Sequence, residues 1–305
     1  MDLTRAADLI RRGEIVGIPT ETVYGLAANA LDVAAVERIY AAKGRPKTSP
    51  LIVHVDSIEM ARSLVADWPP AAQALAERYW PGPLTIILPK RAIVPDLVTA
   101  GLPTAGLRMP AHPIALGLIR ACGLPLAAPS ANRFTGLSPT TAQHVRDSLG
   151  DRVPLVLDGG PCPVGIESTV VSLAGPKPVL LRPGAFTREQ IEAVIGPLGE
   201  YVKSGPADAS PGLHPKHYSP RTRLILGPPP GEGNGVWVFH ARSIEGQRSV
   251  AMPSDPEKYA AALYDTLHQL DSEGLDWIAV EPPPASPQWD AILDRLTRAA
   301  SAEGA

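Results

Sequence analysis

Apolar residues recur three or four positions apart in seven segments of the first two thirds of the chain. This spacing is typical of helices with one buried face, and it predicts helices at residues 4–13, 33–43, 57–66, 70–80, 113–122, 140–149 and 187–195. Short aliphatic runs lie between these segments and predict strands at Ile15–Ile18, Leu51–Val55, Leu84–Leu88, Gly106–Met109, Leu126–Ala128, Leu155–Leu157, Thr169–Leu173 and Val179–Leu181. The alternation indicates an α/β fold, a sheet covered by helices. Because the last three strands follow one another without helices, we expect a mixed sheet.

The last third of the chain predicts a second, smaller unit. Residues 200–222 are rich in Pro, Gly, Ser and His, a composition typical of a linker. Beyond them the pattern predicts strands at Arg223–Leu226, Val236–His240 and Trp277–Val280, and helices at 255–271 and 287–300. We therefore expect a first domain over 1–199, a linker over 200–222, and a small α/β, Rossmann-like domain over 223–305.

Composition narrows the class of protein. The chain has 305 residues, 45% of them hydrophobic and 19% charged, as in ordinary globular proteins. A net charge of −3 argues against a protein that coats nucleic acid. Basic residues slightly outnumber acidic ones over 1–203, so we expect anion binding there. Cys122 and Cys162 lack metal-ligand spacing and are interpreted as reduced, packed thiols. No apolar run has the length of a membrane span or the form of a signal peptide, so we expect a cytoplasmic protein.

Two short polar turns carry the strongest chemical signal. Lys43 and Arg45 stand two positions apart around Gly44, and Ser130 and Asn132 stand two apart after Pro129. Arginine offers a rigid fork of donors and lysine a mobile point charge, a combination that suits a polyphosphate. The P-loop pattern is absent from the sequence, so a nucleotide site here must be of another kind.

Further polar residues follow predicted strands, and each allows two interpretations. Thr20, Glu21 and Thr22 lie after a strand and suit a small polar ligand, but the cap of a following helix is the favoured interpretation. His54, inside an apolar strand, is more commonly a core histidine than a ligand-binding one. Arg108, at a strand end before Met109 and Pro110, could hold a carboxylate, although a surface ion pair is the commoner case.

Two later segments are ambiguous in the same way. Ser138 precedes Pro139 and is expected to cap the helix at 140–149, and that helix start could also bind an anion. Arg182 repeats the strand, arginine, proline order of Arg108. The linker pair His214 and His217 lacks a nearby Cys or carboxylate partner in the sequence, so we do not expect it to bind a metal.

These segments together resemble one family. PTETVYGLAANA, KGRPKTSPLIVHV, YWPGPLTIIL, GLRMPAHP, APSANRFTGLSPTT, LDGGPCPVGIESTVV and LLRPGAF are similar, in order and spacing, to the YrdC domain of threonylcarbamoyl-AMP synthases. The resemblance covers residues 5 to about 196, and the linker and the tail WDAILDRLTRAAS resemble the long, two-domain form. It implies a YrdC-like twisted mixed sheet flanked by helices.

The resemblance also implies a reaction and partners. L-threonine, bicarbonate and ATP would give threonylcarbamoyl-AMP and pyrophosphate, with Mg²⁺ held mainly by the ATP phosphates and not by protein side chains. A downstream tRNA threonylcarbamoyltransferase would use the product, and no stable nucleic-acid binding by this chain is expected. No covalent enzyme nucleophile is needed, in agreement with the lack of a Ser–His or Cys–His signature in the sequence.

The family's sites are carried over residue by residue. Threonine binding would fall on Thr22, His54, Arg108 and Ser168. ATP binding would fall on Arg45, Ser49, Thr104, Ser130, Ser138 and Arg182, with Tyr218 of the linker closing over the nucleotide. The residues that act in the reaction itself would be Lys43, Arg45, Ser130 and Asn132.

Three other functions remain open from the residues alone. A carbamoyl-transfer enzyme of hydrogenase maturation contains a similar domain, but also Cys-rich zinc modules that two isolated cysteines cannot supply. A noncatalytic RNA-binding module is disfavoured by the net negative charge and by having only 3 Phe, because such modules stack bases on aromatic rings. A ligase for another amino acid, serine above all, would differ in affinity by a modest factor, since one methyl group discriminates weakly.

Overall fold

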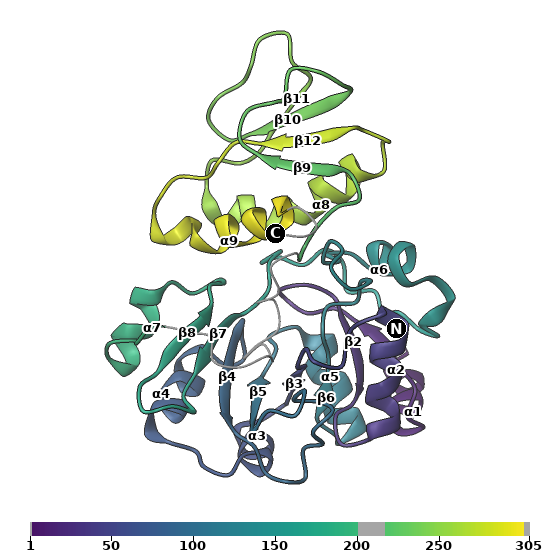
Figure 1. Ribbon diagram of the computed structural model, residues 1–305. Coiled ribbons are helices and arrows are strands. Elements are labelled where there is room, and N and C mark those ends of the chain that lie inside the picture. Colours follow the sequence, from purple (N-terminus) through teal and green to yellow (C-terminus); the bar gives the residue numbers. More distant parts are fainter. Residues whose placement is uncertain (1, 201–216, 302–305) are drawn as a thin grey trace.

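The computed structural model describes residues 2–200 and 217–301, which form a large unit and a smaller one (Figure 1). The large unit holds an eight-stranded sheet in the order β1-β2-β6-β3-β5-β4-β7-β8. Its strands are β1 (Val16–Ile18), β2 (Gly25–Asn29), β3 (Ile52–His54), β4 (Leu84–Pro89), β5 (Thr104–Arg108), β6 (Leu126–Ala127), β7 (Thr169–Ser172) and β8 (Val179–Arg182). β3 pairs with β5 and β4 pairs with β7 in parallel, and the other pairs are antiparallel. The predicted mixed sheet is confirmed.

Helices cover both faces of this sheet. They are α1 (Leu3–Arg11), α2 (Val33–Lys43), α3 (Ile58–Leu64), α4 (Pro70–Tyr79), α5 (Pro113–Cys122), α6 (Ala142–Leu149) and α7 (Arg188–Ile195), with a 3₁₀ turn at Gly150–Arg152. Alternate residues of β2 enter different apolar clusters: Leu26 and Ala28 join the one that contains α2 and α4, and Ala27 joins the one that contains α1 and α5. Because successive side chains of a strand point to opposite faces, the two clusters are the two sides of one covered sheet.

Two local signals determine how α2 ends and where its last residues point. Asp32 caps the start of α2 by accepting from the backbone N–H groups of Ala34 and Ala35, as a short carboxylate does at this position. Gly44 ends the helix in the left-handed conformation, with φ of 63°, which glycine adopts without steric cost. The chain therefore turns between Lys43 and Arg45, and the two cations diverge.

Three expectations for the large unit are wrong. The segment after Thr22 is strand β2 and not the start of a helix, because Gly25–Asn29 pairs with β1 on one side and β6 on the other; Gly, Ala and Asn are weak strand formers, so tertiary pairing decides its conformation. Leu155–Leu157 forms only a single bridge, between Val156 and Gly17. The cap of α6 is Thr141, whose side chain accepts from the N–H of His144, and not Ser138.

The small unit is a parallel four-stranded sheet in the order β11-β10-β12-β9. Its elements are β9 (Arg223–Leu226), β10 (Gly235–Phe239), β11 (Ser249–Ala251), α8 (Pro256–Asp271), β12 (Trp277–Val280), a 3₁₀ turn at Pro287–Trp289 and α9 (Asp290–Ala300). The sequence missed β11, a partly exposed edge strand of three residues that is too short to show alternation. Most of the predicted linker, 201–216, lies outside the described residues.

Helices α8 and α9 lie between the small sheet and the large unit (Figure 1). One apolar cluster joins the two units: Val23, Leu137 and Ile166 of the large unit pack with buried residues of α8 and α9. At Gly165 a Cβ atom would come within 2.4 Å of the carbonyl oxygen of Ala260 in α8, so the backbones are in direct contact there. No helix among the described residues is long and apolar enough to cross a membrane.

Candidate functional site

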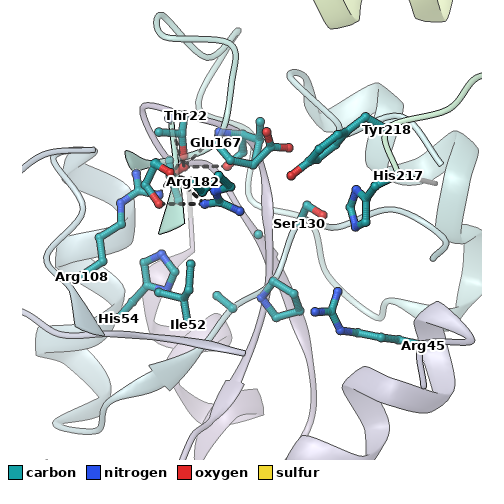
Figure 2. Close-up of a pocket in the computed structure, with 16 residues that line it drawn as sticks. Thr22, Arg45, Ile52, His54, Arg108, Ser130, Glu167, Arg182, His217 and Tyr218 are labelled. Atoms are coloured by element: carbon teal, nitrogen blue, oxygen red, sulfur yellow. Dashed lines mark hydrogen bonds between the residues drawn. The ribbon is translucent and has the colours of Figure 1, made fainter. Parts of the chain in front are cut away.

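One pocket contains most of the predicted ligand-binding residues (Figure 2). Its lining includes Thr22, Arg45, His54, Arg108, Ser130, Ser168, Arg182 and Tyr218. Its floor follows from sheet topology, because His54 and Arg108 are the last residues of the parallel strands β3 and β5 and stand opposite each other in register. Ligands of open α/β sheets bind at the carboxyl ends of strands, and this pocket lies at that edge.

Arg108 defines one end of the pocket. Its guanidinium donates to the Thr22 hydroxyl at 2.9 Å and to the carbonyl of Gly82 at 3.3 Å, and it forms an ion pair with Glu21 at 2.7 Å. Arginine and glutamate are both buried, so this is not the surface ion pair that the sequence favoured. These neighbours hold the guanidinium in place, and because it has five N–H donors, the donors that they leave unused can bind a ligand carboxylate.

His54 lies beside Arg108 and is also buried. Burial, and then the positive charge of Arg108, lower the pKa of His54 to about 3, so the ring is neutral at neutral pH. Its Nδ1 has no hydrogen-bond partner among the residues that the structure describes. The histidine is thus buried, as a core residue would be, yet it also lines the pocket.

The opposite end of the pocket carries Arg45, Ser130 and Tyr218 (Figure 2). Arg45 donates to the hydroxyl of Ser49 and, at 3.0 Å, to the carbonyl of Pro50. The left-handed turn at Gly44 directs Arg45 toward the pocket, and the two acceptors on Ser49 and Pro50 hold its guanidinium at the pocket wall. This end suits an anionic ligand, because the guanidinium is an obligate cation.

Lys43 does not line the pocket. Its ammonium donates to the main-chain carbonyls of Ser130 and Asn132, and its side chain is almost fully buried. Burial, followed by the nearby charge of Arg45, lowers the pKa of Lys43 well below its usual value. The lysine therefore holds the turn that presents Ser130, whereas the sequence assigned it to phosphate.

Four other predicted residues lie behind the pocket wall or away from it. Ser49 binds Arg45, the Asn132 amide donates to the carbonyls of Arg133 and Gly136, and Ser138 donates to the carboxylate of Glu167. Thr104 begins β5, at the end opposite Arg108, in a separate hollow with Thr99 and Leu102. Ser49 and Ser138 thus each bind a residue that lines the pocket, whereas the partners of the Asn132 amide and Thr104 itself lie outside it.

The structure adds pocket residues for which the sequence predicted no role. Glu167 and His217 line the pocket, and Arg295 of α9 binds Glu167 although 128 positions separate them. The rings of His217 and Tyr218 meet edge to face, with centroids 4.1 Å apart and planes inclined by 61°. The Glu167-Ser168 dipeptide before a strand was visible in the sequence; its partner in α9 carried no local signal.

The described residues contain no group of three or more His, Cys, Asp or Glu side chains that could hold a metal ion. His214, the other histidine of the linker pair, lies outside the described residues. For His217, burial and then the charge of Arg45 lower the pKa well below its usual value, so the ring is neutral. Its Nδ1 has no hydrogen-bond partner in the described part of the chain.

Two family models match the chain in succession. The model of Sua5, YciO and YrdC proteins, described as "Telomere recombination", matches residues 8–184. The model described as "Threonylcarbamoyl-AMP synthase, C-terminal domain" matches residues 186–301. The order agrees with the large and small units of the structure.

A curated relative and a solved structure resemble nearly the whole chain, and a second solved structure resembles part of it. A threonylcarbamoyl-AMP synthase of Bacillus subtilis is 44% identical over 98% of this chain and 92% of its own length. The crystal structure of Pyrococcus abyssi Sua5 complexed with L-threonine is 40% identical with a TM-score of 0.92, covering 98% of this chain and 94% of that one. Full-length HypF in its phosphate- and nucleotide-bound form is 21% identical with a TM-score of 0.51 and matches over 59% of this chain and 28% of its own, which indicates a shared fold only.

Proposed function

The chain belongs to the two-domain, Sua5 type of threonylcarbamoyl-AMP synthases, and we propose that it acts as a nucleotidyltransferase that converts L-threonine, bicarbonate and ATP to threonylcarbamoyl-AMP and pyrophosphate. The product would pass to a tRNA threonylcarbamoyltransferase. Since that step acts on tRNA, we place the reaction in the cytoplasm.

The observation that carries this proposal is the two-ended character of the pocket. Arg108, with Thr22 and His54, forms an end suited to a small amino acid, and Arg45 lies at the other end near Ser130. A carboxylate on Arg108 and a phosphate near Arg45 would orient an amino acid and a nucleotide toward each other. This is the arrangement that joining threonine to AMP requires.

The chemistry needs alignment and charge neutralisation from the protein. The threonine amine adds to bicarbonate, and loss of water leaves a carbamate. A carbamate oxygen then forms a bond to the α-phosphorus of ATP, the bond from that phosphorus to the bridging oxygen breaks, and pyrophosphate leaves with its electron pair. The guanidiniums of Arg45 and Arg182 would stabilise the charge that develops on the phosphates.

Mg²⁺ would enter with ATP as part of the substrate. The carboxylate of Glu167 lines the pocket, but its oxygens already accept from Ser138, Tyr264 and Arg295. A carboxylate with these partners is poorly placed to give up its lone pairs to a metal. We therefore propose that the triphosphate oxygens and water supply most of the metal ligands.

The test is pyrophosphate release from ATP by the full chain, with and without L-threonine and bicarbonate. We expect pyrophosphate release only when both L-threonine and bicarbonate are present. Arg108→Ala should strongly raise the KM for threonine, and Arg45→Ala should raise the KM for ATP. Serine in place of threonine measures selectivity. Release that ignores threonine, or tRNA binding without any ATP turnover, would refute the proposal and favour another ligase or an RNA-binding function.

A further inference from the structure

A buried arginine of the small domain contacts two residues that line the pocket, Glu167 and Tyr218. Arg295 lies in α9 and only 1% of its side chain is exposed. Its Nε donates to Glu167 at 2.8 Å, its Nη2 to the carbonyl of Pro183 at 3.0 Å, and its Nη1 to Asp294 at 2.6 Å. A buried charge is tolerated only when it is paired and hydrogen-bonded, and here two of the three partners belong to the large unit.

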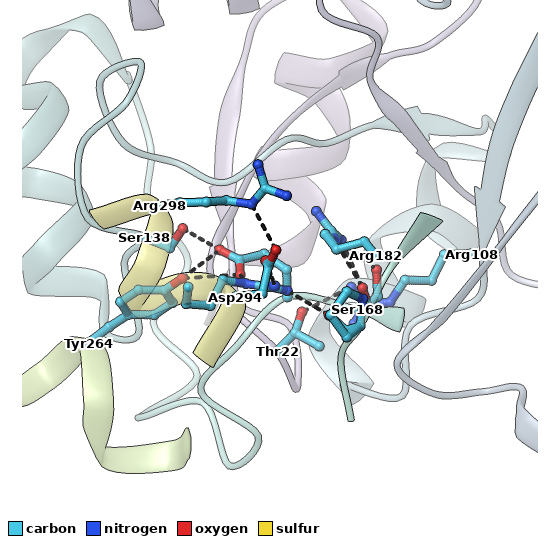
Figure 3. Close-up of polar contacts among 11 residues, drawn as sticks. Thr22, Arg108, Ser138, Ser168, Arg182, Tyr264, Asp294 and Arg298 are labelled. Atoms are coloured by element: carbon cyan, nitrogen blue, oxygen red, sulfur yellow. Dashed lines mark hydrogen bonds and ion pairs between the residues drawn. The ribbon is translucent and has the colours of Figure 1, made fainter. Parts of the chain in front are cut away.

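Several polar contacts between the two units converge on Glu167. Ser138 and Tyr264 donate to the same carboxylate, Tyr264 at 3.2 Å (Figure 3). Burial alone would raise the pKa of Glu167, but the charges of Arg295 and Arg182 and the hydrogen bonds from Ser138 and Arg295 lower it overall. The carboxylate is therefore ionised, and Arg295 is its closest cationic partner.

The contacts of Arg295 flank two predicted ligand-binding residues. Glu167 precedes Ser168, and Pro183 follows Arg182. Arg182 in turn donates to the carbonyl of Ser168 at 2.9 and 3.0 Å and to its hydroxyl at 3.0 Å. By donating to the carbonyl of Pro183, Arg295 holds the backbone next to Arg182, the predicted ATP-binding member of this pair.

Arg295 also contacts Tyr218, which is buried and lines the pocket. The guanidinium carbon lies 5.0 Å from the centre of the tyrosine ring, within the range of a cation–π interaction. Tyr218 has φ of 61°, a left-handed conformation that costs a non-glycine residue energy and persists only where its surroundings hold it. Its hydroxyl has no hydrogen-bond partner among the described residues.

We propose that Arg295 is a positioning residue of the nucleotide half of the site and acts through Glu167 and Tyr218. The small domain would then contribute directly to nucleotide binding. The inference rests on the proposed function. It concerns the nucleotide half because Tyr218 lies at the Arg45 end of the pocket, opposite Arg108 and His54 (Figure 2).

The decisive variant is Arg295→Lys in the full chain, which keeps the charge but loses the planar fork that spans Glu167 and Pro183. We expect kcat/KM for ATP to fall by about 10-fold or more, while the Kd for L-threonine, measured by calorimetry, stays within about 2-fold of wild type. The matched control is Arg248→Lys, also in the small domain, which forms a surface ion pair with Glu273 and contacts neither Glu167 nor Tyr218 in any described interaction; it should change neither value.

A second variant covers the case in which Arg295→Lys fails to fold. Glu167→Gln with Arg295→Met removes both charges and avoids a lone buried carboxylate. This double variant should fold and bind threonine, but bind α,β-methylene-ATP at least about 10-fold more weakly than wild type. Wild-type affinity for that analogue in either folded variant, or equal losses for threonine and nucleotide, would overturn the inference.

The proposed reaction and the proposed role of Arg295 can be refuted independently of each other. If wild-type protein releases no threonine-dependent pyrophosphate, the proposed reaction is wrong. Binding of α,β-methylene-ATP to wild type and variants still decides the role of Arg295, because it requires no turnover.

Discussion

Replacing Lys43 with methionine separates a structural role of this lysine from a role in binding phosphate. Lys43 is 3% exposed, and its ammonium donates to the carbonyls of Ser130 and Asn132. Methionine is similar in length and apolar, so the substitution fills the space but leaves both carbonyls without their donor. We expect the turn that carries Ser130 to shift and the protein to lose stability.

The magnitude follows from the two hydrogen bonds. Bonds from a charged donor contribute roughly 1.5–3 kcal/mol each, and part of this is offset because methionine is buried without the desolvation cost of an ammonium. We expect a net loss of roughly 2–4 kcal/mol. For a domain of this size each kcal/mol lowers Tm by about 2–4 °C, so the expected change is about 5–15 °C.

The assay is thermal unfolding of both proteins, followed by threonine-dependent pyrophosphate release well below the lower Tm. Lys47→Met is the matched control, since the Lys47 side chain is 61% exposed and forms a surface ion pair with Glu37, an interaction that contributes little to stability. Turnover by Lys43→Met should fall, because Ser130 is displaced. A Tm equal to that of wild type, with activity lost, would refute the structural role and indicate that Lys43 binds the phosphates.

Three further predictions follow from the site and the contact between the units. Burial lowers the pKa of His54 to about 3 from an ordinary value near 6.5, so its contribution to stability is fully present above about pH 6.5 and is lost as pH falls toward 3. His54→Asn should therefore flatten the acid side of a plot of Tm against pH, and an unchanged plot would contradict the assigned pKa. Gly184→Ala would place Cβ 2.3 Å from the amide nitrogen of Thr169, so we expect a Tm lower by several degrees and a loss of pyrophosphate release. Wild-type values of both would show that the backbone around Gly184 accommodates a Cβ atom without loss of stability. Gly165→Val would force the backbone away from Ala260 in α8, only 2.4 Å from its Cβ position, and should increase proteolysis between the units and weaken ATP binding; an unchanged protease pattern would argue against tight contact.

The sequence predicted most elements because each carries its own local signal. α2 has apolar periodicity, an Asp32 cap and a Gly44 stop, and these act within a few residues. β2 was missed for the opposite reason. Its residues lack strand propensity, and pairing with β1 and with β6, about a hundred positions away, makes it a strand.

The candidate site shows the same difference between local signals and long-range contacts. The residue types were visible in the sequence: Arg108 at a strand end, Arg45 after a glycine turn, Ser130 on a proline turn. Only the tertiary structure decided which partner each would have, because a side chain's neighbours depend on segments that local patterns do not relate. It paired Arg108 with Glu21, directed Lys43 into the Ser130 turn, and brought Arg295 across 128 positions to Glu167.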